Sequence, residues 1–362
     1  MKQRKEYIDI IRSTLPTSEC LTIQLGKCKI LVKANTKEIK NALQEYFGSF
    51  VIDQVSNHDI LITVHECYKG FIENQMHGVC FAIKNPDPGK TKIKEEFIDL
   101  LDGRIVKKRL TGMFFIFGHG DHLAIGPCLQ NLNQVINFIN NRFIEWKLCR
   151  GSILGHASGI NFEGKGLAIA GFSGAGKSTL ALKIMNLGAS FVSNDRIMVR
   201  KTNNGLAMSG VAKLPRINPG TVLNNPQLES ILSEEERIQF SNLSKDELWH
   251  LEHKYDASID ICYGPNRFLL ESPMHGLVIL NWTNGYSYEP ASQVNISDRV
   301  DLLPAFMKST GLFFLPHSDC FMPAPTIESY IDHLSCCSVW EFNCGIDFEN
   351  AAQACIHFLK EL

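Results

Sequence analysis

The chain has 362 residues, which is long enough for two domains that each bury their own core. Its 44% hydrophobic and 20% charged residues are ordinary for a globular protein. A formal net charge of -2 argues against a general nucleic-acid binder. No apolar run is long enough to span a bilayer, and the first residues lack the apolar core of a signal peptide. We therefore expect a cytoplasmic protein with neither nucleic-acid nor membrane partners.

Residues 1–150 carry the pattern of a mixed α/β domain. The predicted elements are a hairpin around Gly26 and Lys27, helices at 37–47 and 129–147, and strands at 59–65 and 112–118. His119 and His122 flank Asp121, but a hairpin turn explains this cluster more simply than chemistry does. We therefore expect no catalytic group in this part of the chain.

The second domain is expected to begin at residue 151, after the predicted helix, and to extend to residue 362. Strand-like runs and glycines are frequent up to residue 200, and loops rich in Pro and Asn follow. Further along, the pattern predicts a charged helical region at 227–255, a buried strand at 275–282 and a final helix at 348–361.

The 12 cysteines are scattered along the chain, and no Cys-x2-Cys pair occurs. Cys336 and Cys337 are adjacent, which suits neither a strain-free disulfide nor a zinc knuckle. Buried, reduced thiols that act as small hydrophobic groups are therefore favoured over a metal or disulfide role.

The most informative motif has the spacing of a phosphate-binding loop, Gly-x4-Gly-Lys-Ser. Its residues are Gly171, Phe172, Ser173, Gly174, Ala175, Gly176, Lys177, Ser178 and Thr179. The glycines allow successive backbone N–H groups to point at an anion. Lys177 adds a charge for the β- and γ-phosphates, and the Ser178 hydroxyl is placed to hold Mg²⁺. The motif thus predicts binding of a nucleoside triphosphate, with a glycine-rich turn that binds nothing as the alternative.

The sequence on either side of the motif supports the first interpretation. An apolar run at 166–170 predicts a buried strand before the loop, and apolar spacing at 178–187 predicts a helix that ends at Gly188. A strand, a loop and a helix in this order place the phosphates at a helix N-terminus.

A carboxylate follows the next predicted strand, which ends at Asp195. Phosphate-transfer sites place a carboxylate near Mg²⁺ in this way. Only one predicted helix separates Asp195 from Lys177, whereas most switch-type GTPases and transport ATPases place the equivalent aspartate much farther along the chain. The guanine-reading pattern Asn-Lys-x-Asp is also missing from the sequence. The compact arrangement indicates a kinase of another lineage.

Residues 156–199 resemble the core of HPr kinase/phosphorylase. The shared features are His156 before the loop, a Gly-x-Gly before the strand, and the run 193–196, Ser-Asn-Asp-Arg, where the family has Ala-Asp-Asp-Arg. Segments 213–221 and 263–268 look most like the group called HprK-related kinase B. The first 150 residues carry no such match. The resemblance implies an α/β P-loop domain of the HPr kinase and phosphoenolpyruvate carboxykinase type over 151–362, with an N-terminal α/β domain for substrate or partner recognition.

The resemblance also implies roles for individual residues. Residues 171–179 would bind the phosphates of ATP, with Lys177 taking part in catalysis, and Ser178 and Asp195 would hold Mg²⁺. His156 matches the histidine that faces the transferred phosphate. Glu252 matches the family's downstream metal-binding glutamate, although a solvated position on a charged helix explains it equally well. Because HPr kinase is an oligomer, a homo-oligomer is compatible with the resemblance.

The sequence departs from the family at Asn194, where the family has the aspartate implicated as the base. An amide cannot accept a proton as a carboxylate can. Three outcomes stay open. Asp195 or His156 acts as the base, positioning and charge alone support transfer, or the protein binds nucleotide with little or no transfer.

The leading interpretation is an ATP- and Mg²⁺-dependent kinase that phosphorylates a hydroxyl of a protein serine or of a small molecule. A nucleotide-binding regulatory or assembly protein is the second interpretation, and a carboxykinase-like enzyme that acts on a small acid is the third. Arg196, Lys213 and Arg216 are additional candidates for contacts with phosphate or acceptor, and solvation at the surface explains them about as well. The identity of the acceptor does not follow from the sequence.

Overall fold

A computed structural model describes residues 3–53, 56–86, 91–251, 253–283, 286–317, 320 and 325–362, without the side chains of residues 245, 249 and 250. The contacts between residues divide the chain into two units. Unit 1 comprises Met1–Cys149 and Thr310–Pro323, and unit 2 comprises Arg150–Ser309 and Ala324–Leu362. The sequence assigns 310–323 to the second domain, whereas the structure joins this segment to unit 1.

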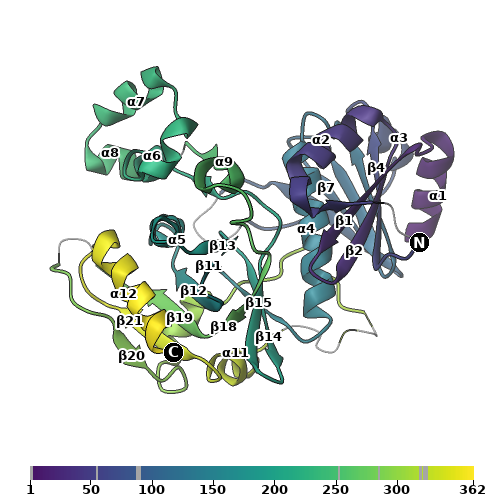
Figure 1. Ribbon diagram of the computed structural model, residues 1–362. Helices are drawn as coiled ribbons and strands as arrows, with labels where there is room; N and C mark the ends of the chain where they lie inside the picture. Colours follow the sequence, from purple (N-terminus) through teal and green to yellow (C-terminus); the bar gives the residue numbers. More distant parts are fainter. Residues whose placement is uncertain are drawn as a thin grey trace. The chain divides into compact units, whose positions relative to one another are not determined.

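Unit 1 is built on a nine-stranded mixed sheet in the order β3-β1-β2-β4-β9-β8-β7-β6-β5 (Figure 1). Its elements are α1 (Arg4–Thr14), β1 (Glu19–Leu25), β2 (Cys28–Ala34), α2 (Lys37–Phe47), the 3-10 helix η1 (Gly48–Phe50), β3 (Val51–Ile52), β4 (Ile60–Glu66), α3 (Phe71–Gln75), β5 (Ala82–Ile83), β6 (Glu95–Leu100), β7 (Gly103–Lys108), β8 (Phe114–Gly118), β9 (Asp121–Gly126) and α4 (Leu132–Leu148). The predicted hairpin, helices and strands of this region are confirmed, with small shifts at their ends.

Apolar residues of this sheet are covered by helices. Tyr7 and Ile11 of α1 and Ile72 of α3 pack against Ile116 and Leu123 of β8 and β9. Helices α2 and α4 contact each other and the strands β1, β2 and β4. The turn between β8 and β9 contains His119 and Gly120, as the sequence predicts.

Unit 2 contains the predicted phosphate-binding loop. Its elements are β10 (Ile153–Gly155), β11 (Ala157–Phe162), β12 (Lys165–Gly171), α5 (Lys177–Asn186), β13 (Ser190–Ser193), β14 (Ile197–Thr202), β15 (Gly205–Ser209), β16 (Arg216–Ile217), α6 (Pro219–Leu223), η2 (Pro226–Ile231), α7 (Glu234–Ser241), α8 (Lys245–His250), β17 (Tyr255–Asp256), α9 (Ile259–Tyr263), β18 (Glu271–Met274), β19 (Gly276–Leu280), β20 (Ser292–Val294), η3 (Val300–Leu302), α10 (Leu303–Phe306), α11 (Ile327–Leu334), β21 (Ser338–Phe342) and α12 (Phe348–Glu361).

A six-stranded sheet in the order β13-β11-β12-β19-β21-β20 forms the centre of unit 2. Strand β12 runs parallel to β19, and β19 runs parallel to β21. Helices α5 and α12 pack together on one side of this sheet (Figure 1), where Leu180 and Ile184 meet Ala351 and Cys355 in one core cluster. A second cluster joins other residues of the sheet to the strands β10, β14 and β15 and to the helices α10 and α11. The loop that follows β12 is therefore fixed between a buried strand and a packed helix.

The charged region 227–255, predicted as helical, is divided into shorter elements. Pro226 begins η2. Ser233 and Ser244 are the N-caps of α7 and α8, and both form capping boxes with the glutamate three residues later. Each capping serine favours a new helix start over the continuation of one long helix. The region ends in the short strand β17 rather than in a helix.

Two cysteines far apart in the sequence form a disulfide, Cys149–Cys320. The expectation of reduced thiols throughout is therefore wrong at these two positions. The other ten cysteines that the structure describes are free. Local spacing could not reveal the pair, because the return of 310–323 to unit 1 is what brings Cys320 to the end of α4.

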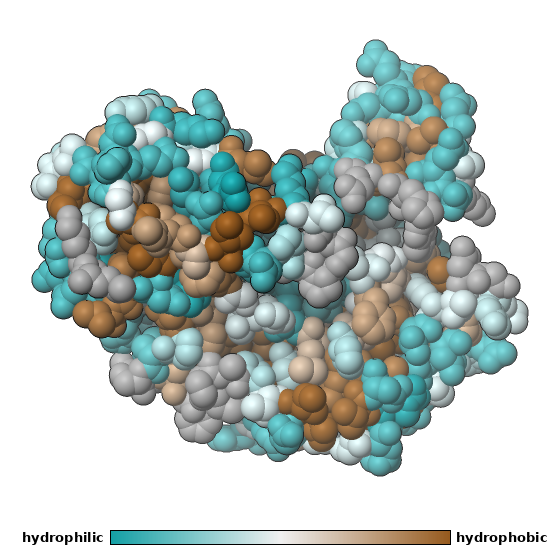
Figure 2. Space-filling view, turned by 180° about the vertical axis from the view of Figure 1, so that it is seen from behind, coloured by the Kyte–Doolittle hydropathy of each residue, from teal (hydrophilic) through white to brown (hydrophobic). Residues whose placement is uncertain are grey.

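The surface shows a mixture of residue types. In Figure 2, hydrophilic residues surround the apolar patches on the face that is drawn. Among the described residues, no helix combines the length and the apolar character that crossing a membrane requires.

Candidate functional site

The predicted loop lies between β12 and α5. Gly174 and Gly176 have φ angles of 85° and 86°, in the left-handed region that favours glycine. Gly176 is the N-cap of α5 and has no side chain that could cap the first N–H groups of the helix. Two further hydrogen bonds shape the loop, from the Ala175 N–H to the Phe172 carbonyl at 3.1 Å and from the Trp282 indole to the Ala175 carbonyl at 3.0 Å. This geometry presents amide groups and a helix N-terminus to an anion.

The ammonium group of Lys177 lies inside this loop. Its Nζ donates to the carbonyl oxygens of Gly171 at 2.8 Å and Phe172 at 3.1 Å. Burial lowers the pKa of Lys177 to about 8, although the charge of Asp195 acts in the opposite direction. Helix α5 packs against β13, the strand that precedes Asp195, so the charge of Asp195 acts on Lys177.

Asp195 is surrounded by basic side chains. Its Oδ1 lies 3.1 Å from His156 Nε2, and its Oδ2 lies 3.6 Å from Arg196 Nε and 3.9 Å from Lys308 Nζ. Burial alone would raise the pKa of Asp195, but the hydrogen bond from His156 and the charge of Lys308 outweigh it, so the pKa lies well below its usual range. An ionised carboxylate with so low a pKa is a weak proton acceptor and a suitable cation ligand.

Lys308 reaches Asp195 because of a short backbone pairing. The His156 N–H donates to the Phe306 carbonyl at 2.6 Å, and the Lys308 N–H donates to the Leu154 carbonyl at 3.2 Å. The ring of Phe306 packs against Gly155, where a Cβ atom would lie 2.4 Å from the ring. The pairing therefore holds Lys308 next to the strand that leads into His156.

The turn that carries Asp195 is held by two serines. Ser158 Oγ donates to the Asn194 carbonyl at 2.7 Å, and Ser193 Oγ donates to the Arg196 carbonyl at 2.6 Å. The side-chain Oδ1 of Asn194 is buried and has no hydrogen-bond partner among the residues that the structure describes. The amide thus stands beside Asp195 without a proton-accepting role.

The other predicted residues of the loop lie at its tip and in the first turn of α5. Ser173 and Gly174 are exposed, whereas Ala175, Ser178 and Thr179 are half-buried. Thr179 Oγ1 lies 2.9 Å from Thr221 Oγ1 of α6, which ties the first turn of α5 to the neighbouring helix.

The lower-ranked candidates have different surroundings. Burial lowers the pKa of Lys213, and the nearby charges of Arg196 and Asp195 also act on it. Arg216 instead pairs with Asp256 at 3.5 Å across β16 and β17. Glu252, the predicted downstream metal ligand, lies outside the described residues.

The structure therefore brings together Lys177, Asp195, His156, Arg196 and Lys213, all of which the sequence singles out. It adds Lys308, which the sequence analysis missed. No local motif marks this lysine, because its position depends on a backbone pairing between residues far apart in the chain.

Comparisons with known proteins give distant structural matches. A solved structure, the Hpr(Ser) kinase/phosphatase from Coxiella burnetii, is 13% identical, and the match covers 57% of this chain and 92% of that chain. Its TM-score is 0.31, and at this value the similarity carries no argument about fold or activity. No family model and no curated protein matches the chain.

Proposed function

We propose that the chain is an ATP- and Mg²⁺-dependent kinase that transfers the γ-phosphoryl group to a hydroxyl, on a protein serine or on a small molecule. One observation carries the proposal: a glycine-rich loop with a buried lysine shares an electrostatic site with a carboxylate that three basic side chains surround. The sequence resemblance of residues 156–199 to HPr kinase/phosphorylase supports the same reaction class. In this proposal, unit 2 forms an HPr-kinase-like P-loop domain, and unit 1 recognises the substrate or a partner.

The loop would hold the phosphates of ATP. Backbone N–H groups at the start of α5 and the positive end of its dipole favour the anion. Lys177 already has its ammonium group beside the loop backbone, 2.8 Å from the Gly171 carbonyl. A bound phosphate would compete with the two carbonyl groups for this cation and would replace weak neutral acceptors by a charged one.

The donor set fits a magnesium ion. Asp195 supplies an ionised carboxylate, and Ser178, half-buried in the first turn of α5, supplies a hydroxyl. Hard oxygen donors of this kind suit Mg²⁺, which keeps part of its water shell and binds substrate phosphates. When bound, the ion would neutralise charge on the phosphate oxygens.

The chain's own residues would support transfer by position and charge. His156, Arg196 and Lys308 lie within 3.1 to 3.9 Å of the Asp195 carboxylate, so they would fix the position of this carboxylate beside the transferred group. The low pKa of Asp195 argues against this residue as a strong base. Phosphoryl transfer tolerates a weak base, because its transition state is loose and depends mainly on alignment and charge stabilisation.

The surroundings of Asn194 favour a second candidate function, a nucleotide-binding regulatory or assembly protein with little transferase activity. The amide oxygen is buried without a partner among the described residues, and a carboxylate at this position would be the direct base that the site lacks. The two functions share ATP binding and differ in turnover.

The test compares γ-labelled ATP turnover in purified protein mixed with cell lysate. Transfer to a protein or a small molecule should be lost in Lys177→Ala and kept in Lys183→Ala. Lys183 is a matched control, because it lies on the same helix and pairs with Glu349 at 2.9 Å. Intact transfer in Lys177→Ala would show that the kinase proposal is wrong.

The Asn194→Asp variant separates the two functions. If it increases transfer at unchanged ATP affinity, the site is a kinase centre that works without a strong base. Tight ATP binding without turnover in either the wild type or Asn194→Asp would support the regulatory function.

A further inference from the structure

The segment 310–323 is fastened to α4 of unit 1 by polar contacts. The Arg142 guanidinium donates to the Phe313 carbonyl and lies 2.9 Å from Glu145 Oε1. The other Glu145 oxygen accepts the Leu315 N–H at 2.9 Å. Arg142 and Glu145 are buried, so these contacts fix the path of the segment towards the end of the helix.

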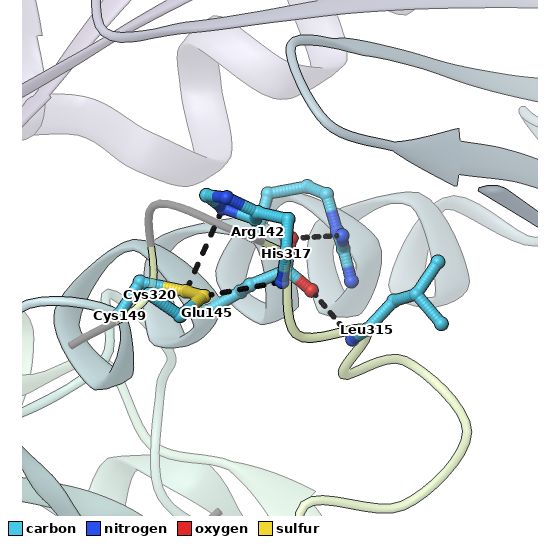
Figure 3. The surroundings of a disulfide bond; sticks show 6 residues. All are labelled: Arg142, Glu145, Cys149, Leu315, His317 and Cys320. Atoms are coloured by element: carbon cyan, nitrogen blue, oxygen red, sulfur yellow. Dashed lines mark hydrogen bonds and ion pairs between the residues drawn. A yellow bond between two sulfur atoms is a disulfide. The ribbon is translucent and has the colours of Figure 1, made fainter. Parts of the chain in front are cut away.

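Three metal-ligating side chains meet at that end. Cys149 caps α4, and the imidazole of His317 and the sulfur of Cys320 face it (Figure 3). Cys149 Sγ lies 3.7 Å from His317 Nε2, and one ligand atom from each of the three residues lies within 4.8 Å of the others. No motif in the first unit pointed to this cluster, because Cys149 is far from the other two residues in the sequence.

The sulfur–nitrogen separation agrees with that around a tetrahedral ion, whereas the two sulfurs are bonded to each other and must separate on reduction before both can bind one ion. Zn–S bonds of about 2.3 Å and Zn–N bonds of about 2.0–2.1 Å place sulfur and nitrogen about 3.5 Å apart. The backbone also suits a metal-binding turn, since the His317 N–H donates to Cys320 Sγ at 3.5 Å and the Cys320 N–H donates to the His317 carbonyl at 3.0 Å. An amide that donates to the sulfur stabilises the thiolate that a metal requires.

Further imidazoles border the cluster. The rings of His119 and His317 have centres 4.3 Å apart. His122 is buried, with an Nδ1 that has no hydrogen-bond partner among the described residues. Since His119 packs against the ring of His317, it helps to hold that ring in place.

We propose that Cys149, His317 and Cys320 bind Zn²⁺ when the two cysteines are reduced, with His119 packed against the ring of His317. A dithiol reductant gives two electrons and two protons to the Cys149–Cys320 disulfide and becomes a disulfide itself. Zn²⁺ then displaces the two thiol protons to water as the Zn–S bonds form. The site is independent of the proposed kinase function.

The other cysteines favour the reduced form. The ten that the structure describes outside this pair form no disulfide, and Cys80 and Cys336 are exposed among them. A chain with this many free thiols suits a reducing environment, where close cysteines with a histidine bind metal more often than they remain oxidised. A disulfide that only stabilises the fold also does not require the His317 imidazole beside it.

The experiment measures metal in the untagged, full-length protein after reduction by a dithiol and dialysis with Zn²⁺. We expect about one zinc ion per chain, and Co²⁺ in its place should give the visible spectrum of tetrahedral thiolate coordination. Cys149→Ser, Cys320→Ser and His317→Ala should lose the ion, and His119→Ala should bind it more weakly. Cys80→Ser is the matched control and should keep it.

The proposal fails if the reduced protein binds no zinc and gives no cobalt–thiolate spectrum. It also fails if His317→Ala and Cys149→Ser keep the ion, or if mass spectrometry finds the disulfide intact with dithiol and Zn²⁺ present. If the cysteine variants do not fold, the variants His317→Ala and His317→Cys test the proposal instead. His317→Ala should lose zinc, whereas His317→Cys supplies a new thiolate and should retain it.

Discussion

Lys177 shows, at the scale of one residue, how burial prepares a group for an anion. Its side chain is buried, and its pKa is lowered to about 8 mainly by burial. Because this ammonium group is poorly solvated, a bound phosphate would strongly stabilise its charged form. The same burial brings its titration close to neutral pH.

We predict that the affinity of the free protein for ATP falls as the pH rises through about 8. Below that value Lys177 is protonated and attracts the phosphates, and above it the neutral amine does not. Calorimetric titration with ATP from neutral to alkaline pH measures the fall. Lys177→Arg keeps its charge over this range and should not show it. An equal fall in that variant would assign the titration to another group.

A pair of glycine variants separates backbone strain from crowding in the loop. Gly174 and Gly176 have nearly the same φ, but a Cβ at Gly176 would lie 2.4 Å from the Phe348 ring, and one at Gly174 would meet nothing within 4 Å. We expect Gly174→Ala to cost about 1–2 kcal/mol of unfolding free energy, from the left-handed backbone alone. Gly176→Ala should cost clearly more. Equal losses in thermal or chemical unfolding would contradict the close packing of Phe348.

At the scale of elements, the candidate site depends on how separate segments pair. The loop and α5 are continuous in sequence, but Asp195 follows β13, and Lys308 follows α10. Lys308 lies near Asp195 because residues 306–308 form hydrogen bonds with Leu154 and His156 at the end of β10.

We predict that Lys308→Ala weakens ATP binding about fivefold, which corresponds to about 1 kcal/mol. The effect stays modest because the Asp195 side chain is 50% exposed, so solvent screens the charges around it. Lys201→Ala is the control, since this lysine forms a comparable ion pair with Asp332 at 2.6 Å on β14. Equal ATP-binding constants for the two variants would show that Lys308 does not contribute to ATP binding.

Local patterns predicted most of the elements, because hydrophobic spacing and turn residues act over a few positions. The strand β12, the helix α5 and the hairpin of β1 and β2 follow from such spacing. The region 227–255 is largely helical as predicted, but its division into η2, α7 and α8 and its end in β17 were not predicted. Lys308 and the Cys149–Cys320 pair were not predictable, because tertiary pairing alone places them.

At the scale of the whole molecule, the returning segment completes the core of unit 1. The ring of Phe313 contacts the rings of Phe115, Phe117 and Phe138, with centres 5.5, 5.6 and 6.1 Å apart. The segment is therefore a part of this core, although it follows most of unit 2 in the sequence.

We predict that Phe313→Ala lowers the free energy of unfolding of unit 1 by about 2–3 kcal/mol, because the three rings lose a partner. Leu110→Ala, at a side chain that is 57% exposed in the same unit, should change it little. Hydrogen exchange in the strands and helices of unit 1 reports this unit separately from unit 2. Unchanged protection of α4 in Phe313→Ala would contradict a role for the segment in the core.

The return of 310–323 also sets the order of events during synthesis. A ribosome releases the first 149 residues early, but the aromatic cluster and the contacts of Arg142 wait for Phe313. At about 5–20 residues per second, the nascent first unit spends on the order of ten seconds incomplete. During that interval unit 2 begins to fold between the two parts of unit 1. Unit 1 therefore cannot be completed until residues 150–309 of unit 2 have been synthesised. Chaperones that protect exposed aromatic residues would act in this interval.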